Sequence, residues 1–215
     1  MIRTTTLLLA LAAALHAQSG ATFSADYFPL EAGLSYQYES SIGDMEGETR
    51  AKGVGTILTY EGDGIVYRQT YLANDEGVFL NRLNYTVDLL VYSSESVVTY
   101  DKPVLIYPFP LEVGERWTWT GKEFYGEDNR GMTLRGHARK TQRIETPAGA
   151  YDCLVVDITM EYEGKEEPQR MTQYLAEGVG VVRLEAPLGG SAVAWIAKNI
   201  LGMERFAFSL TAFSK

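Results

Sequence analysis

Apolar and polar residues alternate with a period of two along much of the chain. The alternation is clearest in residues 34–42, 116–122 and 152–162, where aromatic or aliphatic side chains occupy nearly every second position. Successive side chains of a strand point to opposite faces of a sheet, so this pattern is typical of strands with one buried and one wet face. The sequence therefore predicts an all-β, mainly antiparallel protein.

Turn-forming residues separate these runs. Residues 61–64 predict a tight hairpin, 146–149 a proline turn and 163–168 a longer polar loop. Further strands are expected at 53–60, 65–72, 77–92, 132–144, 170–175, 179–185 and 205–213.

One segment breaks the rhythm. Residues 192–201 carry apolar side chains at helical spacing, between Ser191 and Gly202 as potential caps. They predict a short helix, with a strand as the alternative because several of these residues are β-branched.

An internal duplication is the most specific pattern in the sequence. Residues 28–38 and 109–119 share the motif F-P-L-E-x-G-x-x-aromatic-x-aromatic. A weaker echo, Tyr-Leu-Ala followed by Gly-Val, relates 71–78 to 174–181 in the same order. We therefore predict two related β units, about residues 27–105 and 108–213, packed together as one curved sheet or half-closed β-barrel.

The start of the chain has the layout of a secretory signal peptide. Arg3 precedes a short apolar run at 7–15, and the small residue Ala17 follows. That run is shorter than the roughly 20 residues needed to cross a bilayer. We expect residues 1–17 to be removed, with cleavage after Ala21 as the alternative, leaving a single soluble β domain over 18–215 without a transmembrane anchor.

Charge and cysteine content exclude several classes of partner and bond. The formal net charge of −9 repels nucleic acid and anionic lipid surfaces. Cys153 is the only cysteine, so an intrachain disulfide is impossible and lipid attachment at the cleavage site is not expected. We expect Cys153 to be an inert packing residue.

Catalytic and metal-binding motifs find no support. His137 is the only histidine after the leader, and the G-x-S-x-G motif of serine hydrolases is absent from the sequence. One histidine and one cysteine argue against zinc, and the short acidic loops lack the spacing of a calcium site. We assign no catalytic residue, metal or cofactor. A hydrolase whose carboxylates meet only in space remains an alternative.

Aromatic residues on the alternating strands, together with a later tryptophan, are the first binding candidates. Core packing explains them most simply, and the alternative is a concave aromatic face that holds an apolar or amphipathic ligand. These residues are Tyr36, Tyr38, Trp117, Trp119 and Trp195.

A basic stripe on the polar face of 132–144 is the second candidate, in a chain that is otherwise acidic. The simplest explanation is a solvated strand face. The alternative is a patch for an anionic ligand or a protein partner. The stripe consists of Arg135, His137, Arg139 and Arg143.

Three motifs in order resemble a family of exported bacterial β proteins. They are F-P-L-x-x-G-x-x-W at 109–117, T-P-A-G-x-Y at 146–151 and G-V-G-x-V at 178–182. The family consists of domains of unknown function, TapB-like proteins among them. The resemblance implies a barrel-like antiparallel fold and no established enzymatic activity. The inferred architecture is also distantly similar to the open β-barrels of periplasmic lipoprotein carriers.

The sequence thus favours an exported, non-catalytic protein of the bacterial cell envelope that binds an apolar small molecule or lipid on an aromatic concave face. The alternative is a protein-interaction module in an envelope assembly. The choice between periplasm and cell exterior stays open.

Overall fold

The computed structural model describes residues 21–89, 92–187 and 205–215. These residues form strands almost throughout, with one short 3-10 helix, η1 (Ala25–Tyr27). The strands are β1 (Thr22–Phe23), β2 (Ser35–Ser40), β3 (Gly43–Lys52), β4 (Gly55–Gly62), β5 (Ile65–Asn74), β6 (Gly77–Leu89), β7 (Tyr92–Tyr107), β8 (Leu111–Glu112), β9 (Arg116–Tyr125), β10 (Asp128–Thr146), β11 (Gly149–Tyr162), β12 (Gln169–Ala176), β13 (Gly180–Pro187) and β14 (Arg205–Ser214). The predicted leader, the predicted helix at 192–201 and Trp195 lie outside the described residues.

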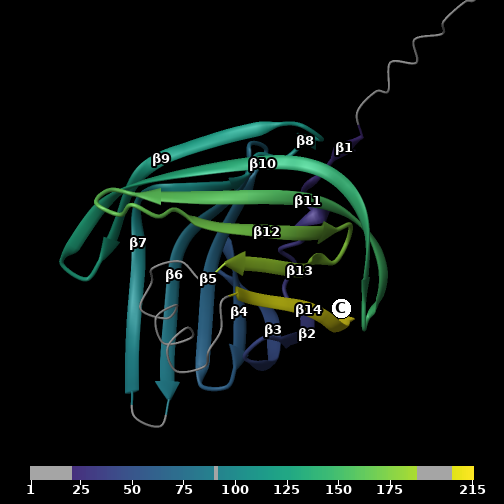
Figure 1. Cartoon of the computed structure of the whole chain (residues 1–215), viewed down its shortest axis with the longest axis horizontal. Helices are drawn as coiled ribbons and strands as arrows, with labels where there is room; N and C mark the ends of the chain where they lie inside the picture. The colour runs from purple at the N-terminus through teal and green to yellow at the C-terminus, as the bar shows by residue number, and fades with distance from the viewer. Residues whose placement is uncertain (1–20, 90–91, 188–204) are drawn as a thin grey trace, which may run out of the picture.

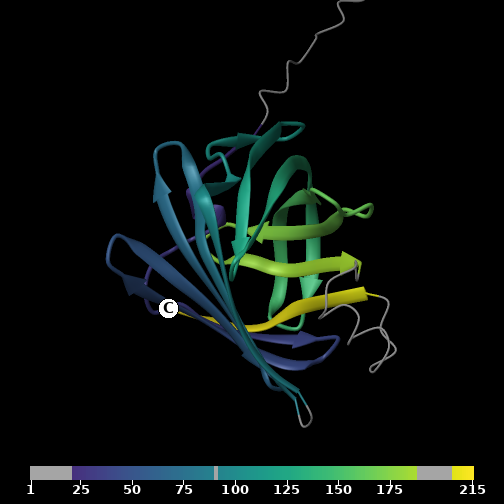
Figure 2. The same cartoon turned by 90° about the vertical axis from the view of Figure 1, so that its left-hand side faces the viewer.

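Twelve of the described strands form a closed antiparallel barrel in the order β10-β11-β12-β13-β14-β2-β3-β4-β5-β6-β7-β9. In Figure 1, β10–β14 run across the view while β5–β7 run up and down it. The turned view in Figure 2 shows the same two groups of strands crossing one another. The all-β, antiparallel prediction is confirmed, and the barrel is closed rather than half-closed.

The barrel closes through a short contact between β7 and β9. Only three residue pairs join these strands, and they end at Tyr100 and Glu123. Continuing the register would place Pro103 opposite Thr120, and proline has no N–H with which to extend the ladder. We call the region beyond these pairs the seam.

One end of the barrel is filled by the two copies of the repeated motif. Residues 28–34 lead into β2 and residues 109–115 lead into β9, and both segments lie at this end, the motif end. Phe28 and Phe109 pack against the same ring, that of Tyr107, with centroid distances of 5.0 and 5.6 Å. The opposite end, at which β9 turns into β10, is called the far end.

Cys153 lies beneath the N-terminal segment on the outer face of β11. It is 1 % exposed, and burial raises the pKa of its thiol to about 12. The N–H of Gly178 donates to the carbonyl oxygen of Asp26 at 2.8 Å, which holds that segment against the barrel. The prediction that Cys153 is a buried packing residue is confirmed.

The structure corrects the strand prediction near residue 42. The alternation of 34–42 predicts one strand, but β2 ends at Ser40. The Ser40 hydroxyl donates to the carbonyl oxygen of Gly43 at 2.6 Å and accepts the N–H of Ile42 at 3.2 Å, so the chain turns here. Local side-chain bonding therefore overrides the apolar period.

Candidate functional site

The aromatic pairs predicted from the sequence are buried on the inner face of the barrel. Tyr36 and Tyr38 come from β2, Trp117 and Trp119 from β9, and each is at most 8 % exposed. A glycine on the neighbouring strand faces the first aromatic of each pair: Gly47 faces Tyr36, and Gly136 faces Trp117. The missing side chain leaves room for the ring, so core packing accounts for their positions.

The structure does not bring the two aromatic pairs together. In the barrel order, β3–β7 separate β2 from β9 on one side and β10–β14 separate them on the other, so the pairs lie on opposite walls. Tyr36 stacks on Tyr38, with ring centroids 6.0 Å apart. Trp119 instead meets Tyr100 edge-on at 6.3 Å. A single aromatic patch made of all four residues therefore does not form.

Trp119 also borders a shallow groove of about 410 Å³ at the seam. Leu72, Phe79 and Leu105 line its apolar side. The ammonium group of Lys102 lies 5.7 Å from the centre of the Trp119 ring. We call this feature the seam groove.

A row of tyrosines crosses the inner face of β2–β6. Tyr36 faces Gly47, which faces Tyr60, and Tyr60 then pairs with Tyr67. Tyr67 continues the row to Tyr85, with ring centroids 6.5 Å apart. Residues paired directly across strands share a face, so this row lines the interior.

Methionines line the interior on both walls. Each of the four described methionines pairs across strands with inward-facing residues, and three of them remain partly exposed. They are Met45, Met132, Met160 and Met171. Tyr60 and Tyr67 are also partly exposed. These inward-facing side chains keep some accessible surface.

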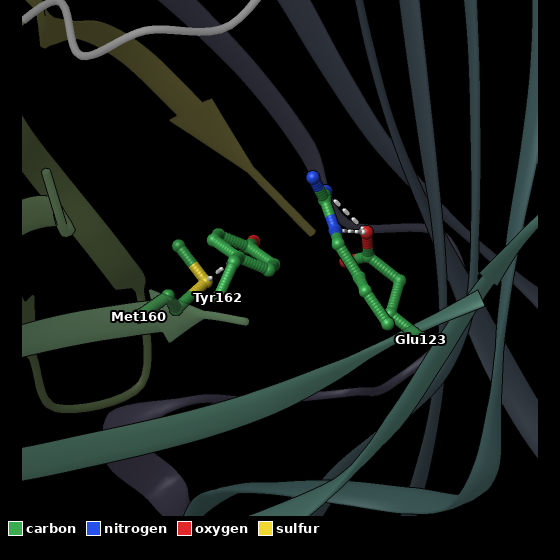
Figure 3. Close-up of polar contacts among 4 residues, drawn as sticks. Glu123, Met160 and Tyr162 are labelled. Carbon is green, nitrogen blue, oxygen red and sulfur yellow. Dashed lines mark hydrogen bonds and ion pairs between the residues drawn. The ribbon is translucent and has the colours of Figure 1, made fainter. Parts of the chain in front are cut away.

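An ion pair lies inside the barrel near the far end (Figure 3). Arg130 of β10 donates from both Nε, at 3.0 Å, and Nη2 to the same Oε1 of Glu123 of β9. Glu123 is 6 % exposed, whereas the side chain of Arg130 is 34 % exposed. A buried carboxylate without a partner is strongly destabilising, so the ion pair with Arg130 stabilises Glu123 at its buried position.

Tyr162 of β11 faces this ion pair, and two cations approach its ring. Arg130 Cζ lies 4.1 Å from the ring centre and Lys165 Nζ lies 5.7 Å from it. The Tyr162 hydroxyl donates to the Met160 sulfur at 3.7 Å, as Figure 3 shows. Burial raises the pKa of Tyr162, and the charge of Glu123 adds to the rise. The phenol therefore stays protonated at neutral pH.

Burial likewise raises the pKa of Tyr67, to about 12, and that of Tyr100. The charge of Glu123 contributes to both shifts, and Tyr100 pairs directly with Glu123 across β7 and β9. Neutral phenols, thioethers and one ion pair can hold an apolar or amphipathic molecule.

The sequence analysis missed the ion pair. The alternation of 116–122 places Trp117 and Trp119 inward, and two further steps of the same period reach Glu123. That extension was the available signal for an inward carboxylate. No comparable signal exists for Arg130, because the register of β9 with β10 decides which arginine meets Glu123.

Each arginine of the basic stripe is paired with an acidic residue. The β-bulge between Ala138 and Lys140 places Arg143 and Asp152 on the same face as Leu154 and Val156, so the predicted stripe does not continue along one face. The ion pairs are Arg135–Glu161 at 3.2 Å, Arg139–Asp157 at 3.4 Å and Arg143–Asp152 at 3.2 Å. The stripe therefore presents alternating charges rather than an excess of positive charge. Its proposed role as a partner patch has less support than binding in the interior.

His137 lies on the outer face and is partly buried. Burial lowers its pKa, and the charge of Arg116 lowers it further. His137 therefore adds little positive charge to the stripe at neutral pH.

Two classes of feature are absent from residues 21–89, 92–187 and 205–215. No cluster of three or more histidine, cysteine, aspartate or glutamate side chains is arranged to hold a metal ion there. Within the same ranges, no helix has the length and apolar character needed to cross a membrane.

Comparison with protein families gives one partial match. A family model described as DUF3108-like matches residues 126–187, the part of the chain that contains β10–β13. This agrees, for that part, with the resemblance to bacterial domains of unknown function. The TapB-like relationship stays a prediction. No curated protein matches the sequence.

Three solved structures are similar at low sequence identity. The hypothetical lipoprotein YmcC from Escherichia coli is 10 % identical with a TM-score of 0.45, covering 87 % of this chain and 89 % of its own. A candidate lipoprotein from Parabacteroides distasonis is 16 % identical with a TM-score of 0.42, covering 90 % and 99 %. A candidate exported protein with a YmcC-like fold from Bacteroides fragilis is 14 % identical with a TM-score of 0.36, covering 91 % and 100 %. These similarities do not indicate a ligand.

Proposed function

We propose that this protein is a non-catalytic component of the bacterial cell envelope that binds an apolar or amphipathic molecule inside its barrel. The observation that carries the proposal is the set of inward-facing tyrosines and methionines that remain partly exposed. Methionine is flexible and polarisable, so it adapts to apolar ligands of varied shape. Tyrosine supplies a rigid apolar face with one hydrogen-bond donor.

The leader supports the cellular setting of the proposal. Residues 1–17 have the charge, apolar run and small residue of an exported precursor. Apolar molecules are poorly soluble in the aqueous spaces of the envelope, and a barrel interior shields them from water. The proposal is therefore that the protein stores or carries such a molecule.

Native mass spectrometry tests whether a ligand is present. The protein is purified gently from the envelope fraction of its host and weighed before and after denaturation. We expect extra mass that denaturation releases and that is identified as a lipid or another apolar molecule. A protein that carries no such mass, and that also fails to bind dodecyl maltoside saturably below its micellar concentration, contradicts the proposal.

A matched pair of variants locates the site. Met160 faces the interior and Leu105 lines the seam groove, and both are partly exposed. Met160→Gln should weaken dodecyl maltoside binding about tenfold, because the ligand loses apolar contact. Leu105→Gln should leave the affinity unchanged. The reverse pattern would move the binding site to the seam groove and overturn the interior assignment.

A further inference from the structure

Positive charge exceeds negative charge around Tyr162. Arg130 and Lys165 both approach its ring, and Glu123 forms the ion pair with Arg130. The neighbouring Glu163 points elsewhere, since its carboxylate accepts the N–H of Gly131 at 3.3 Å. Two cations and one acid therefore surround Tyr162 at the far end, in a protein whose net charge is −9.

Arg130 keeps hydrogen-bonding capacity beyond its bond with Glu123. A guanidinium group has five N–H donors in a fixed plane. Two nitrogens, Nε and Nη2, are directed to the single oxygen Oε1 of Glu123. The third nitrogen, Nη1, makes no bond to Glu123, and 34 % of the Arg130 side chain is exposed.

Glu123 fixes the orientation of this guanidinium group. The carboxylate is buried and bonded to one side of Arg130, while the Tyr162 ring packs on its face at 4.1 Å. A group held by an ion pair and a ring loses little additional entropy when it binds a ligand. Glu123 therefore acts as a positioning residue.

We propose that Arg130, with Lys165 beside it, binds the anionic head group of the ligand, a carboxylate or a phosphate, while the apolar body lies among the tyrosines and methionines. This inference rests on the proposed function and adds the chemistry of the head group. Arginine suits such anions because its N–H groups match the geometry of their oxygens.

Calorimetric titrations with amphiphiles of one chain length test the inference. The probes are dodecanoate, dodecyl phosphate, dodecyltrimethylammonium and dodecyl maltoside, each below its micellar concentration, with acetate and inorganic phosphate as free anions. We expect the two anionic amphiphiles to bind about tenfold or more tightly than dodecyl maltoside, and the cationic one most weakly. Free anions should bind far more weakly than their dodecyl forms.

Variants with effects of opposite sign separate ligand binding from structural support. Glu123→Gln removes the competing negative charge, so dodecanoate should bind more tightly. The double variant Glu123→Gln/Arg130→Gln keeps a neutral polar pair inside and should lose the preference for anions while it still binds dodecyl maltoside. Lys165→Gln, at an exposed position, should weaken dodecanoate binding by about twofold to threefold.

Each outcome decides a different point. Equal affinity for all four amphiphiles overturns the head-group inference and leaves the proposed function standing, whereas absence of binding by every amphiphile overturns both. Acetate or phosphate that binds as tightly as its dodecyl form would show a simple anion site and overturn the inference. An unchanged preference for anions in the double variant Glu123→Gln/Arg130→Gln would show that Arg130 does not bind the head group and overturn the inference.

Discussion

The wall that begins at β2 and the wall that begins at β9 repeat one backbone arrangement with different aromatic residues. The motif glycines have φ values of 94° and 95°, a region that favours glycine. The N–H of each glycine donates to the carbonyl oxygen of a residue on the next long strand. The N–H of that same residue donates to the carbonyl oxygen of the residue that follows the glycine. These bonds are Gly33–Thr49, Thr49–Leu34, Gly114–Ala138 and Ala138–Glu115. They support the predicted duplication, which stays a prediction.

The two walls differ in how their polar atoms are satisfied. The Tyr38 hydroxyl donates to the carbonyl oxygen of Val181 at 3.0 Å. The indole N–H groups of Trp117 and Trp119 are buried, and neither has a hydrogen-bond partner among the described residues. A buried donor without a partner costs about 1–3 kcal/mol. The repeated backbone thus places an aromatic ring, and the opposite strands decide whether its polar atom is satisfied.

Alkaline pH should produce the largest effect and act first on the tyrosine wall. Burial raises the pKa of Tyr36, Tyr38 and Tyr60, and raises that of Tyr67 to about 12. The unfolded chain releases these protons near pH 10, so their contribution to stability is complete below pH 10 and is lost as the pH rises through 12. We expect loss of structure in this window, starting in the tyrosine wall and measured by circular dichroism and tyrosinate absorbance.

Hydrogen exchange provides the control for the alkaline experiment. Amides of β2–β5 should lose protection before those of β9–β11, where the facing aromatics Trp117 and Trp119 do not titrate. Simultaneous loss of protection in both walls would contradict the distinction between them. Tyr125, which is 45 % exposed, should ionise before unfolding, because its bonds to Ser96 and Tyr85 lower its pKa.

The glycines that face the first aromatics provide the next comparison. A Cβ on Gly136 would lie 2.0 Å from the Trp117 ring, whereas one on Gly47 would lie 3.1 Å from Tyr36. Gly136→Ala should reduce the free energy of unfolding by about 3 kcal/mol, because the ring must leave its place. Gly47→Ala should change it by less than about 1 kcal/mol, since removal of a flexible glycine offsets the tight contact. Urea unfolding measures both, and equal losses would show that the walls are equally tight.

Removal of single hydroxyl groups should have a smaller effect. Tyr38→Phe deletes the hydroxyl that donates to the buried carbonyl oxygen of Val181, so it should cost about 1–2 kcal/mol. Tyr36→Phe, in the same wall, is the matched control and should change stability by under about 0.5 kcal/mol, because no described residue accepts a hydrogen bond from Tyr36. A larger loss for Tyr36→Phe than for Tyr38→Phe would be inconsistent with this assignment.

The exposed ion pairs of β10 and β11 should matter least. Arg135 and Arg143 are 56 % and 63 % exposed in their pairs. Arg135→Gln and Arg143→Gln should each reduce stability by about 0.5 kcal/mol or less, and the loss should shrink further in high salt. Urea unfolding at two ionic strengths is the measurement. A loss above about 1 kcal/mol would show that the pairs act as a connected network.

Strands with a strong apolar period were predictable, and strands without it were not. The alternation in β9 and β11 predicts their inner faces, including Trp117 and Ile158. In contrast, β3 is rich in glycine and charged residues, and β7 contains Pro103 and many polar residues, so neither was predicted. β3 holds its place by pairing with β2 and β4, and β7 mainly by pairing with β6, which is tertiary information.

By itself, the sequence determined the fold class, the hairpin turns at 61–64 and 146–149, the position of the repeated aromatics and the burial of Cys153. These depend on local periodicity, backbone freedom and residue size, which any short window contains. Only the tertiary structure decided that the barrel closes, that the two aromatic pairs face each other from opposite walls, and that Glu123 meets Arg130 inside. Those features depend on strand register and barrel order, because residues far apart in the chain become neighbours only after every strand has found its partner.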